Sequence, residues 1–104
     1  MRSFYTKIVG VTFDNSNGTS RQSLIADLDN LPCDLQLERQ QENPHDCNAV
    51  AVLDPQGRQL GYLSRAVADQ IARLLDLGST VQVQATQVTG GWPFNYGVNL
   101  RLEY

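Results

Sequence analysis

The chain is poor in lysine and carries a net negative charge, which limits the surfaces that it can present to a ligand. Lys7 is its only lysine, the other seven basic residues are arginines, and the formal net charge is −3. Proteins that follow a nucleic-acid backbone usually present a strongly basic face. The composition therefore excludes a broad phosphate-binding surface. It leaves room for a small local site, because the planar guanidinium of arginine pairs with phosphate and stacks on bases.

The usual motifs of metal and catalytic sites are also absent. Cys33, Cys47 and the single histidine, His45, form no C-x-x-C or H-x-x-x-H pair of the kind that structural zinc sites use. There is no P-loop, G-x-S-x-G or H-E-x-x-H motif. Side chains of adjacent residues on an extended segment point to opposite faces, so His45 and Asp46 form no obvious catalytic pair. We expect no metal, no cofactor and no enzymatic activity.

Long hydrophobic runs are missing as well. No segment approaches the roughly 18 apolar residues of a membrane span, and the start of the chain lacks the apolar core of a signal peptide. We therefore expect no membrane association, a cytoplasmic location, and reduced, unpaired cysteines. The 104 residues, 41% of them hydrophobic, suit a single domain over residues 1–104, with no repeat or linker.

Hydrophobic periodicity predicts a mainly β chain with two short helices, an α+β fold. Ser20 and Ser64 are expected to cap the helices, which end at Pro32 and Gly78. Asp-Pro-Gln-Gly at residues 54–57 fits a type I turn. Five or six short strands with two inserted helices predict a small, partly open barrel. Alternation places the strands at residues 4–13, 33–39, 49–53, 58–63, 81–85 and 98–104.

The stretch from Leu35 to Leu63 contains the densest group of polar side chains. Its corner, residues 42–48, reads E-N-P-H-D-C-N and carries more functional groups than a connector requires. Loops held by rigid strands are common places for binding groups. The stretch resembles the HIRAN domain family, whose N-P-(Y/H)-D-x-N-A-(V/I) corner and I/L-G-(Y/H)-(L/V) strand are similar to ENPHDCNAV and LGYL in this chain. The resemblance extends over nearly the whole chain.

This resemblance implies a stand-alone HIRAN-like domain with an OB-like β-barrel. It also implies binding of single-stranded DNA at a free 3′ end, in DNA repair or replication. In the best-understood members of the family two aromatic side chains sandwich the terminal base, and an Asp accepts a hydrogen bond from the terminal hydroxyl. By position in the motifs, the Asp role falls on Asp46 and the aromatic pair on Phe13 and His45. Further positions of the family match Tyr62, Arg65 and Tyr96.

The residues themselves leave alternatives open. Arg39 shares a strand face with Leu35 and Leu37, so it lines a groove or extends out of it. Asn43, like Asn48, is a ligand or a turn former, and Asp46 can equally accept a hydrogen bond within its own loop. Phe13, like Phe94, can be an ordinary core residue. Arg65 can be a solvated surface charge.

A second function, of a different class, also fits the sequence. The acidic charge favours a protein-interaction module over a nucleic-acid-binding one. Such a module would use edge strands and the loop from Trp92 to Tyr96 to dock a helicase or nuclease partner.

Overall fold

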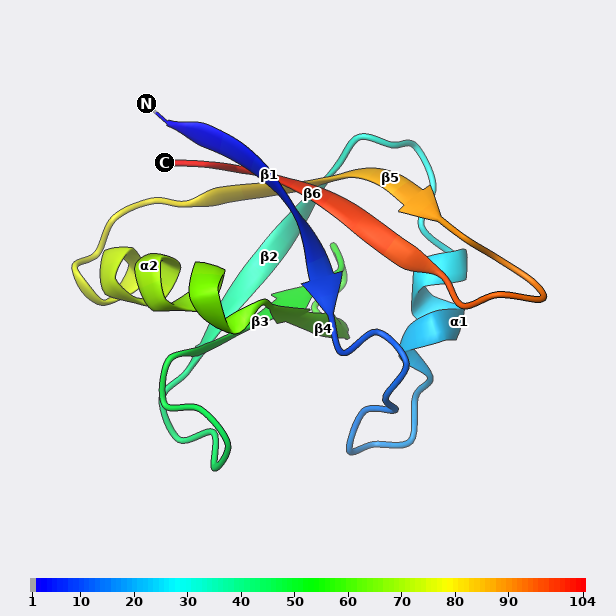
Figure 1. The fold of residues 1–104 in the computed structure, drawn as a ribbon, viewed down its shortest axis with the longest axis horizontal. Coiled ribbons are helices and arrows are strands. Elements are labelled where there is room, and N and C mark those ends of the chain that lie inside the picture. Colours follow the sequence, from blue (N-terminus) through cyan, green and yellow to red (C-terminus); the bar gives the residue numbers. More distant parts are fainter. Residues whose placement is uncertain (1) are drawn as a thin grey trace.

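The computed structural model describes residues 2–104, which form six antiparallel strands and two helices (Figure 1). The strands close into a barrel in the order β1-β4-β3-β2-β5-β6. The α+β fold class is therefore confirmed. The elements are β1 (Ser3–Val9), α1 (Arg21–Ala26), β2 (Cys33–Gln40), β3 (Ala49–Leu53), β4 (Gln59–Leu63), α2 (Arg65–Asp76), β5 (Gln82–Thr89) and β6 (Gly97–Glu103).

The six strands form a closed barrel, whereas we expected a partly open one. The pairing between β1 and β4, called here the seam, is short. Strands β1 and β4 pair only through Ile8 with Leu63 and Val9 with Tyr62, whereas β1 and β6 pair along five residues from Ser3 to Lys7. Gly61 makes the seam possible, because a Cβ at this position would collide with the Val9 carbonyl and the Ile8 side chain. This close approach of β4 to β1 depends on a contact between distant residues, which alternation along each strand does not predict.

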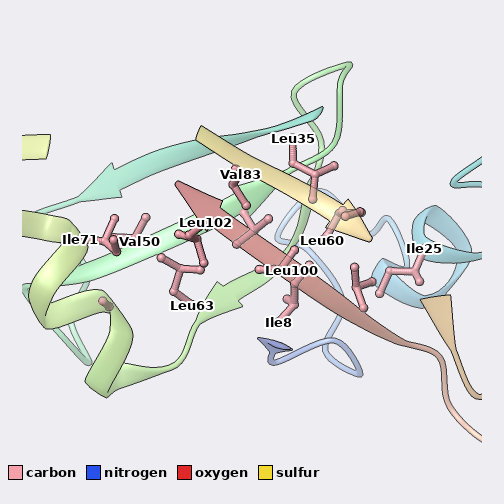
Figure 2. Close-up of a cluster of buried hydrophobic side chains, with 14 of the residues drawn as sticks. Ile8, Ile25, Leu35, Val50, Leu60, Leu63, Ile71, Val83, Leu100 and Leu102 are labelled. Atoms are coloured by element: carbon pink, nitrogen blue, oxygen red, sulfur yellow. The ribbon is translucent and has the colours of Figure 1, made fainter. Parts of the chain in front are cut away.

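One hydrophobic core fills the barrel and extends under both helices (Figure 2). Alternate residues of the strands point inward, as in β6, where Val98, Leu100 and Leu102 are buried between half-exposed neighbours. Ile25 of α1 and Ile71 of α2 are fully buried at the two sides of this cluster. All six strands and both helices therefore contribute side chains to this core.

Both predicted helix caps are confirmed. The Ser20 and Ser64 hydroxyls accept hydrogen bonds from the backbone N–H groups of Ser23 and Val67, the third helical residue in each case. Helix α2 ends at Asp76, with Leu77 as its C-cap, and the left-handed φ of 79° at Gly78 supplies the predicted stop. Helix α1 ends at Ala26, well before Pro32, with Asp27 as its C-cap, and the left-handed φ of 53° at Asn30 excludes that residue from a longer helix.

The first strand is also shorter than predicted. It ends at Val9 and not at residue 13, because Gly10 has a φ of 71° and begins a turn closed by the N–H of Phe13 and the carbonyl of Gly10. The turn at residues 54–57 forms as predicted, with the Gly57 N–H donating to the Asp54 carbonyl at 2.9 Å. Within residues 2–104, neither helix is long and apolar enough to cross a membrane.

Candidate functional site

A pocket of about 250 Å³ opens at the short seam between β1 and β4. Two loops reach down on either side of the end of β1: the corner between β2 and β3, and the loop between β1 and α1 (Figure 1). Five of the eight residues proposed from the sequence line this pocket. Its walls are Asn43, His45, Asp46, Tyr62 and Arg65, with Val9, Ala49 and Leu63.

The corner owes its shape to asparagine and aspartate side chains. Asn43 Oδ1 accepts hydrogen bonds from the backbone N–H groups of His45 at 2.9 Å and Asp46 at 3.3 Å. Asn48 Nδ2 donates to Asp69 Oδ1 of α2 at 3.1 Å, which ties the corner to the helix. Asn43 is thus a turn former that also lines the pocket. The corner is a preorganised loop, because its own side chains satisfy its backbone.

The two oxygens of Asp46 have different surroundings. Oδ1 accepts a hydrogen bond from the Asn48 backbone N–H at 2.9 Å, so the local loop role is present. Oδ2 faces Arg65, whose Nε lies 3.7 Å away. The Asp46 side chain is 21% exposed and that of Arg65 is 76% exposed. One oxygen therefore holds the loop, and the other lies beside an exposed cation on the pocket wall.

Tyr62 forms a fixed wall of the pocket. Its hydroxyl donates to Gln40 Oε1 at 3.0 Å and accepts from Asn43 Nδ2 at 3.3 Å. The guanidinium carbon of Arg21 lies 5.5 Å from the centroid of the Tyr62 ring, within the range of a cation–π contact. The ring is therefore held at its hydroxyl and across its face.

Arg21 is the residue of this region that the sequence analysis missed. It is the first residue of α1, and only 8% of it is exposed. Its Nη1 donates to the Gly10 carbonyl and its Nε to Asn15 Oδ1, both at 2.8 Å. It belongs to none of the ion pairs found in residues 2–104. No local sequence pattern predicts the burial of Arg21. Its burial depends on contacts with the loop before α1 and with the Tyr62 ring.

Phe13 lies on the surface close to Tyr62, outside the pocket lining. Its ring and that of Tyr62 each come within 4 Å of the place that a Cβ on Gly10 would occupy. Phe13 is 67% exposed and Phe94 is 76% exposed, so the core interpretation of both residues is wrong. Neither aromatic contributes to the barrel interior, and Phe13 remains free to contact a ligand.

Arg39 lies outside the pocket and joins three elements. It forms an ion pair with Asp76 of α2, with Nε 3.1 Å from Oδ1, and its Nη1 donates to the Cys47 carbonyl at 2.6 Å. The hydrogen bond from Arg39 lowers the pKa of Asp76. Arg39 borders a separate, shallower hollow of about 660 Å³ that also contains Glu38 and Glu42.

Tyr96 is also placed away from the pocket. Its side chain packs against the core. Gln22 of α1 holds its backbone, accepting from the Tyr96 N–H at 2.6 Å and donating to the Tyr96 carbonyl at 3.0 Å. The same amide donates to the Val11 carbonyl at 2.9 Å. The loops that carry Tyr96 and Phe13 are therefore linked through one side chain.

The thiols and potential metal ligands form no cluster in the described part of the chain. No three His, Cys, Asp or Glu side chains gather there as metal ligands would. Cys33 and Cys47 are free, and burial raises the pKa of the Cys33 thiol, helped by the nearby Asp34 and Asp29 charges. Cys33 is therefore protonated at neutral pH and is a poor nucleophile.

Comparison with known proteins gives one consistent family. The family model of the HIRAN domain matches residues 1–101. The crystal structure of the HIRAN domain of human HLTF superimposes with a TM-score of 0.71 at 21% identity, covering 96% of this chain and 72% of that chain. The NMR structure of the HLTF HIRAN domain gives 0.60 at 22% identity, covering 97% and 74%.

A bacterial structure is equally similar. The crystal structure of a protein from Lactobacillus plantarum superimposes with a TM-score of 0.70 at 21% identity, covering 99% of this chain and all of that chain. No curated protein matches the sequence significantly. At these identities the solved structures establish a common fold, and the family assignment comes from the match along the sequence.

Proposed function

The chain belongs to the HIRAN domain family, and from that premise we propose that it binds single-stranded DNA by capturing a free 3′ end. The observation that carries the proposal is the convergence of Asn43, His45, Asp46, Tyr62 and Arg65 on one pocket. These residues come from two separate parts of the sequence, the corner and the β4–α2 junction. Asn43, His45 and Asp46 belong to the corner that is similar to the family motif, and Tyr62 and Arg65 match further positions of the family.

The electrostatics of Asp46 suit an end-binding site. A carboxylate repels phosphate, so Asp46 would be a poor partner for the interior of a strand, where each nucleotide is followed by a phosphate. At a 3′ end the same oxygen can accept a hydrogen bond from a hydroxyl. Asp46 would thus disfavour binding of the interior of a DNA strand and favour binding of its 3′ end. Arg65, beside Oδ2, is well placed to pair with the phosphate that precedes the terminal nucleotide.

The aromatic groups around the pocket suit a base. His45 lies on the pocket wall and Phe13 lies exposed on the opposite loop. Stacking of a base on an aromatic ring contributes roughly 1–3 kcal/mol and needs no particular base. We therefore expect capture of the terminal nucleotide without sequence preference, in a protein acting in DNA repair or replication.

The decisive experiment is a binding titration with three otherwise identical single strands. One ends in a 3′-hydroxyl, one in a 3′-phosphate, and one is a closed circle without ends. The proposal expects the 3′-hydroxyl strand to bind most tightly and the circle to bind least. Equal affinity for all three would exclude end capture. The same series in RNA shows whether the 2′-hydroxyl matters.

A second function is supported by the loop between β5 and β6. Trp92 is 93% exposed and Phe94 is 76% exposed. The N–H of Phe94 donates to the Gly91 carbonyl at 2.6 Å, and Gln22 holds the end of the loop. Large apolar groups displayed on an ordered loop are typical of protein-binding surfaces. A helicase or nuclease that binds the unmodified domain but not a Trp92→Ala, Phe94→Ala variant would support this function.

A further inference from the structure

Strand β1 presents a row of outward side chains that starts at the pocket. Alternation turns Tyr5, Lys7 and Val9 outward and buries Ile8. Val9 is itself a wall of the pocket. Tyr5 lies about 14 Å from Val9 along the strand, at the usual rise per residue. The row therefore leads from the pocket along the outside of the barrel.

A β-bulge lies at a further hollow beside this row. Strands β5 and β6 pair Ala85 with Leu100 and Gln87 with Asn99, which leaves Thr86 as the extra residue. Bulges redirect side chains and are frequent next to binding sites. This β1 hollow has a volume of about 430 Å³ and is lined by Tyr5, Thr6, Lys7, Thr86, Gln87 and Asn99. None of these residues is acidic, although the protein as a whole has a net charge of −3.

The β1 hollow contains an aromatic ring and a cation. Tyr5 is 71% exposed. Lys7 takes part in none of the ion pairs found among residues 2–104. On the floor of the hollow, Asn99 Nδ2 donates to Gln87 Oε1 at 3.2 Å, which joins the two strands beside the bulge. A ring for stacking and a cation for phosphate are groups that bind a nucleotide of a single strand.

The charge on the other side of the pocket favours β1 as the path. There, the larger hollow beside the corner contains Glu38 and Glu42, and its Arg39 is already paired with Asp76. Phosphates leaving the pocket in that direction would meet uncompensated carboxylates. Phosphates leaving along β1 would meet Lys7, because Lys7 is the next outward residue after Val9.

We propose that the β1 hollow is a second nucleotide subsite, which binds the part of the strand that precedes the captured 3′ end. Tyr5 stacks on a base and Lys7 pairs with a phosphate. This inference rests on the proposed function, since it needs the 3′ end to be seated in the pocket. It assigns to β1 a role in affinity, and leaves the choice of the end to Asp46.

The test compares thymidine strands of two and eight nucleotides, all ending in a 3′-hydroxyl. A further eight-nucleotide strand keeps its terminal base but is abasic at every preceding position. Tyr5→Ala should weaken binding of the ordinary eight-nucleotide strand roughly tenfold. It should leave the dinucleotide and the abasic strand nearly unchanged, and Tyr5→Trp should preserve the affinity. Lys7→Gln should reduce the salt slope for the longer strand by about 0.7.

Two matched substitutions serve as controls. Phe94→Ala removes an equally exposed aromatic, and Arg73→Gln removes an exposed cation of α2; neither should change the length dependence. Unchanged binding of the eight-nucleotide strand by Tyr5→Ala and Lys7→Gln, with preference for a 3′-hydroxyl intact, would overturn the subsite alone. Absence of that preference in the unmodified protein would overturn the proposed function and the subsite together.

Discussion

At the scale of single residues, Asp46 has two tasks that a substitution can separate. Oδ1 holds the corner and Oδ2 faces the pocket. In Asp46→Asn the amide oxygen can keep the bond from the Asn48 N–H, which places an NH₂ donor where Oδ2 was. We expect the preference for a 3′-hydroxyl over a 3′-phosphate to disappear, because the charge-assisted hydrogen bond is worth roughly 1.5–3 kcal/mol. Titrations with the two strands measure this change.

A control for that prediction removes an acid elsewhere. Asp29→Asn lowers the net negative charge equally at an exposed site outside the pocket lining, and should leave the preference intact. If Asp29→Asn changes the preference as much as Asp46→Asn does, overall charge and not a specific contact is responsible.

The exposed position of Phe13 makes its role testable without loss of the fold. Phe13→Ala should change the free energy of unfolding by less than about 0.5 kcal/mol, as surface substitutions usually do. It should weaken single-strand binding by roughly 1–3 kcal/mol, because one stacking partner is lost. His45→Tyr should maintain or strengthen binding, since the larger ring offers more stacking area. Paired thermal-unfolding and affinity measurements test both variants; unchanged affinity in Phe13→Ala would remove Phe13 from the site.

Arg21 connects folding to the shape of the pocket. Arg21→Met keeps the length of the side chain but leaves the Gly10 carbonyl and Asn15 Oδ1 without their donor. An unsatisfied buried polar group costs roughly 1–3 kcal/mol, so we expect a lower unfolding free energy. Affinity for a single strand should fall too, because Tyr62 and the Phe13 loop lose their common anchor. Urea unfolding and a titration measure the two effects; full affinity in a destabilised Arg21→Met would confine Arg21 to a structural role.

At the scale of elements, Arg39 braces β2, α2 and the corner. Its hydrogen bond lowers the pKa of Asp76 below the ordinary 3.8. The ionised Asp76 therefore stabilises the fold above that ordinary value, and the contribution is lost as the pH falls through the lowered pKa. Asp76→Asn should reduce the melting temperature at pH 7 and have little effect near pH 2. An equal reduction at both pH values would show that the pair's charge does not matter.

Elements that alternation and turn residues mark in the sequence were predicted well. The ends of elements that depend on the folded backbone were not. The sequence from Ala49 through the turn at residues 54–57 to Leu63 combines alternation with turn residues, and it forms β3, the turn and β4 as expected. The lengths of β1 and α1 were overestimated, because the left-handed backbone at Gly10 ends the strand and the backbone leaves the helical conformation between Asp27 and Asn30.

The residues of the candidate site were likewise predicted where they belong to a local motif, and not where distant residues decide their position. Motif positions found the residues that line the pocket, since the corner and the β4–α2 junction are local features. Arg39 and Tyr96 were placed near the site by strand alternation and by a loose match, but long-range partners, Asp76 and Gln22, hold them elsewhere. The burial of Arg21 could not be predicted, because it requires the path of a loop over a distant strand.

At the scale of the whole molecule, the charge distribution predicts mild salt dependence. The net charge is −3 and the cations near the proposed path are few. Each phosphate contact with a single strand contributes about −0.7 to the log–log slope, so two to four contacts give roughly −1.5 to −3. Arg65→Gln should reduce the magnitude by less than one unit, and Arg73→Gln should not change it. A slope steeper than about −5 would indicate an extended basic surface and contradict this picture.

The seam between β1 and β4, which has only two residue pairs, links the pocket to local opening of the barrel. The pocket includes Val9 from one side of the seam and Tyr62 from the other. A bound 3′ end would therefore contact both strands of the shortest pairing in the barrel. These contacts would slow the local separation of β1 from β4. Conversely, any force or partner that pulls β1 from β4 would separate the two walls and release the end. Residence time would then follow the opening of the seam, so that release can be triggered while the rest of the barrel stays folded.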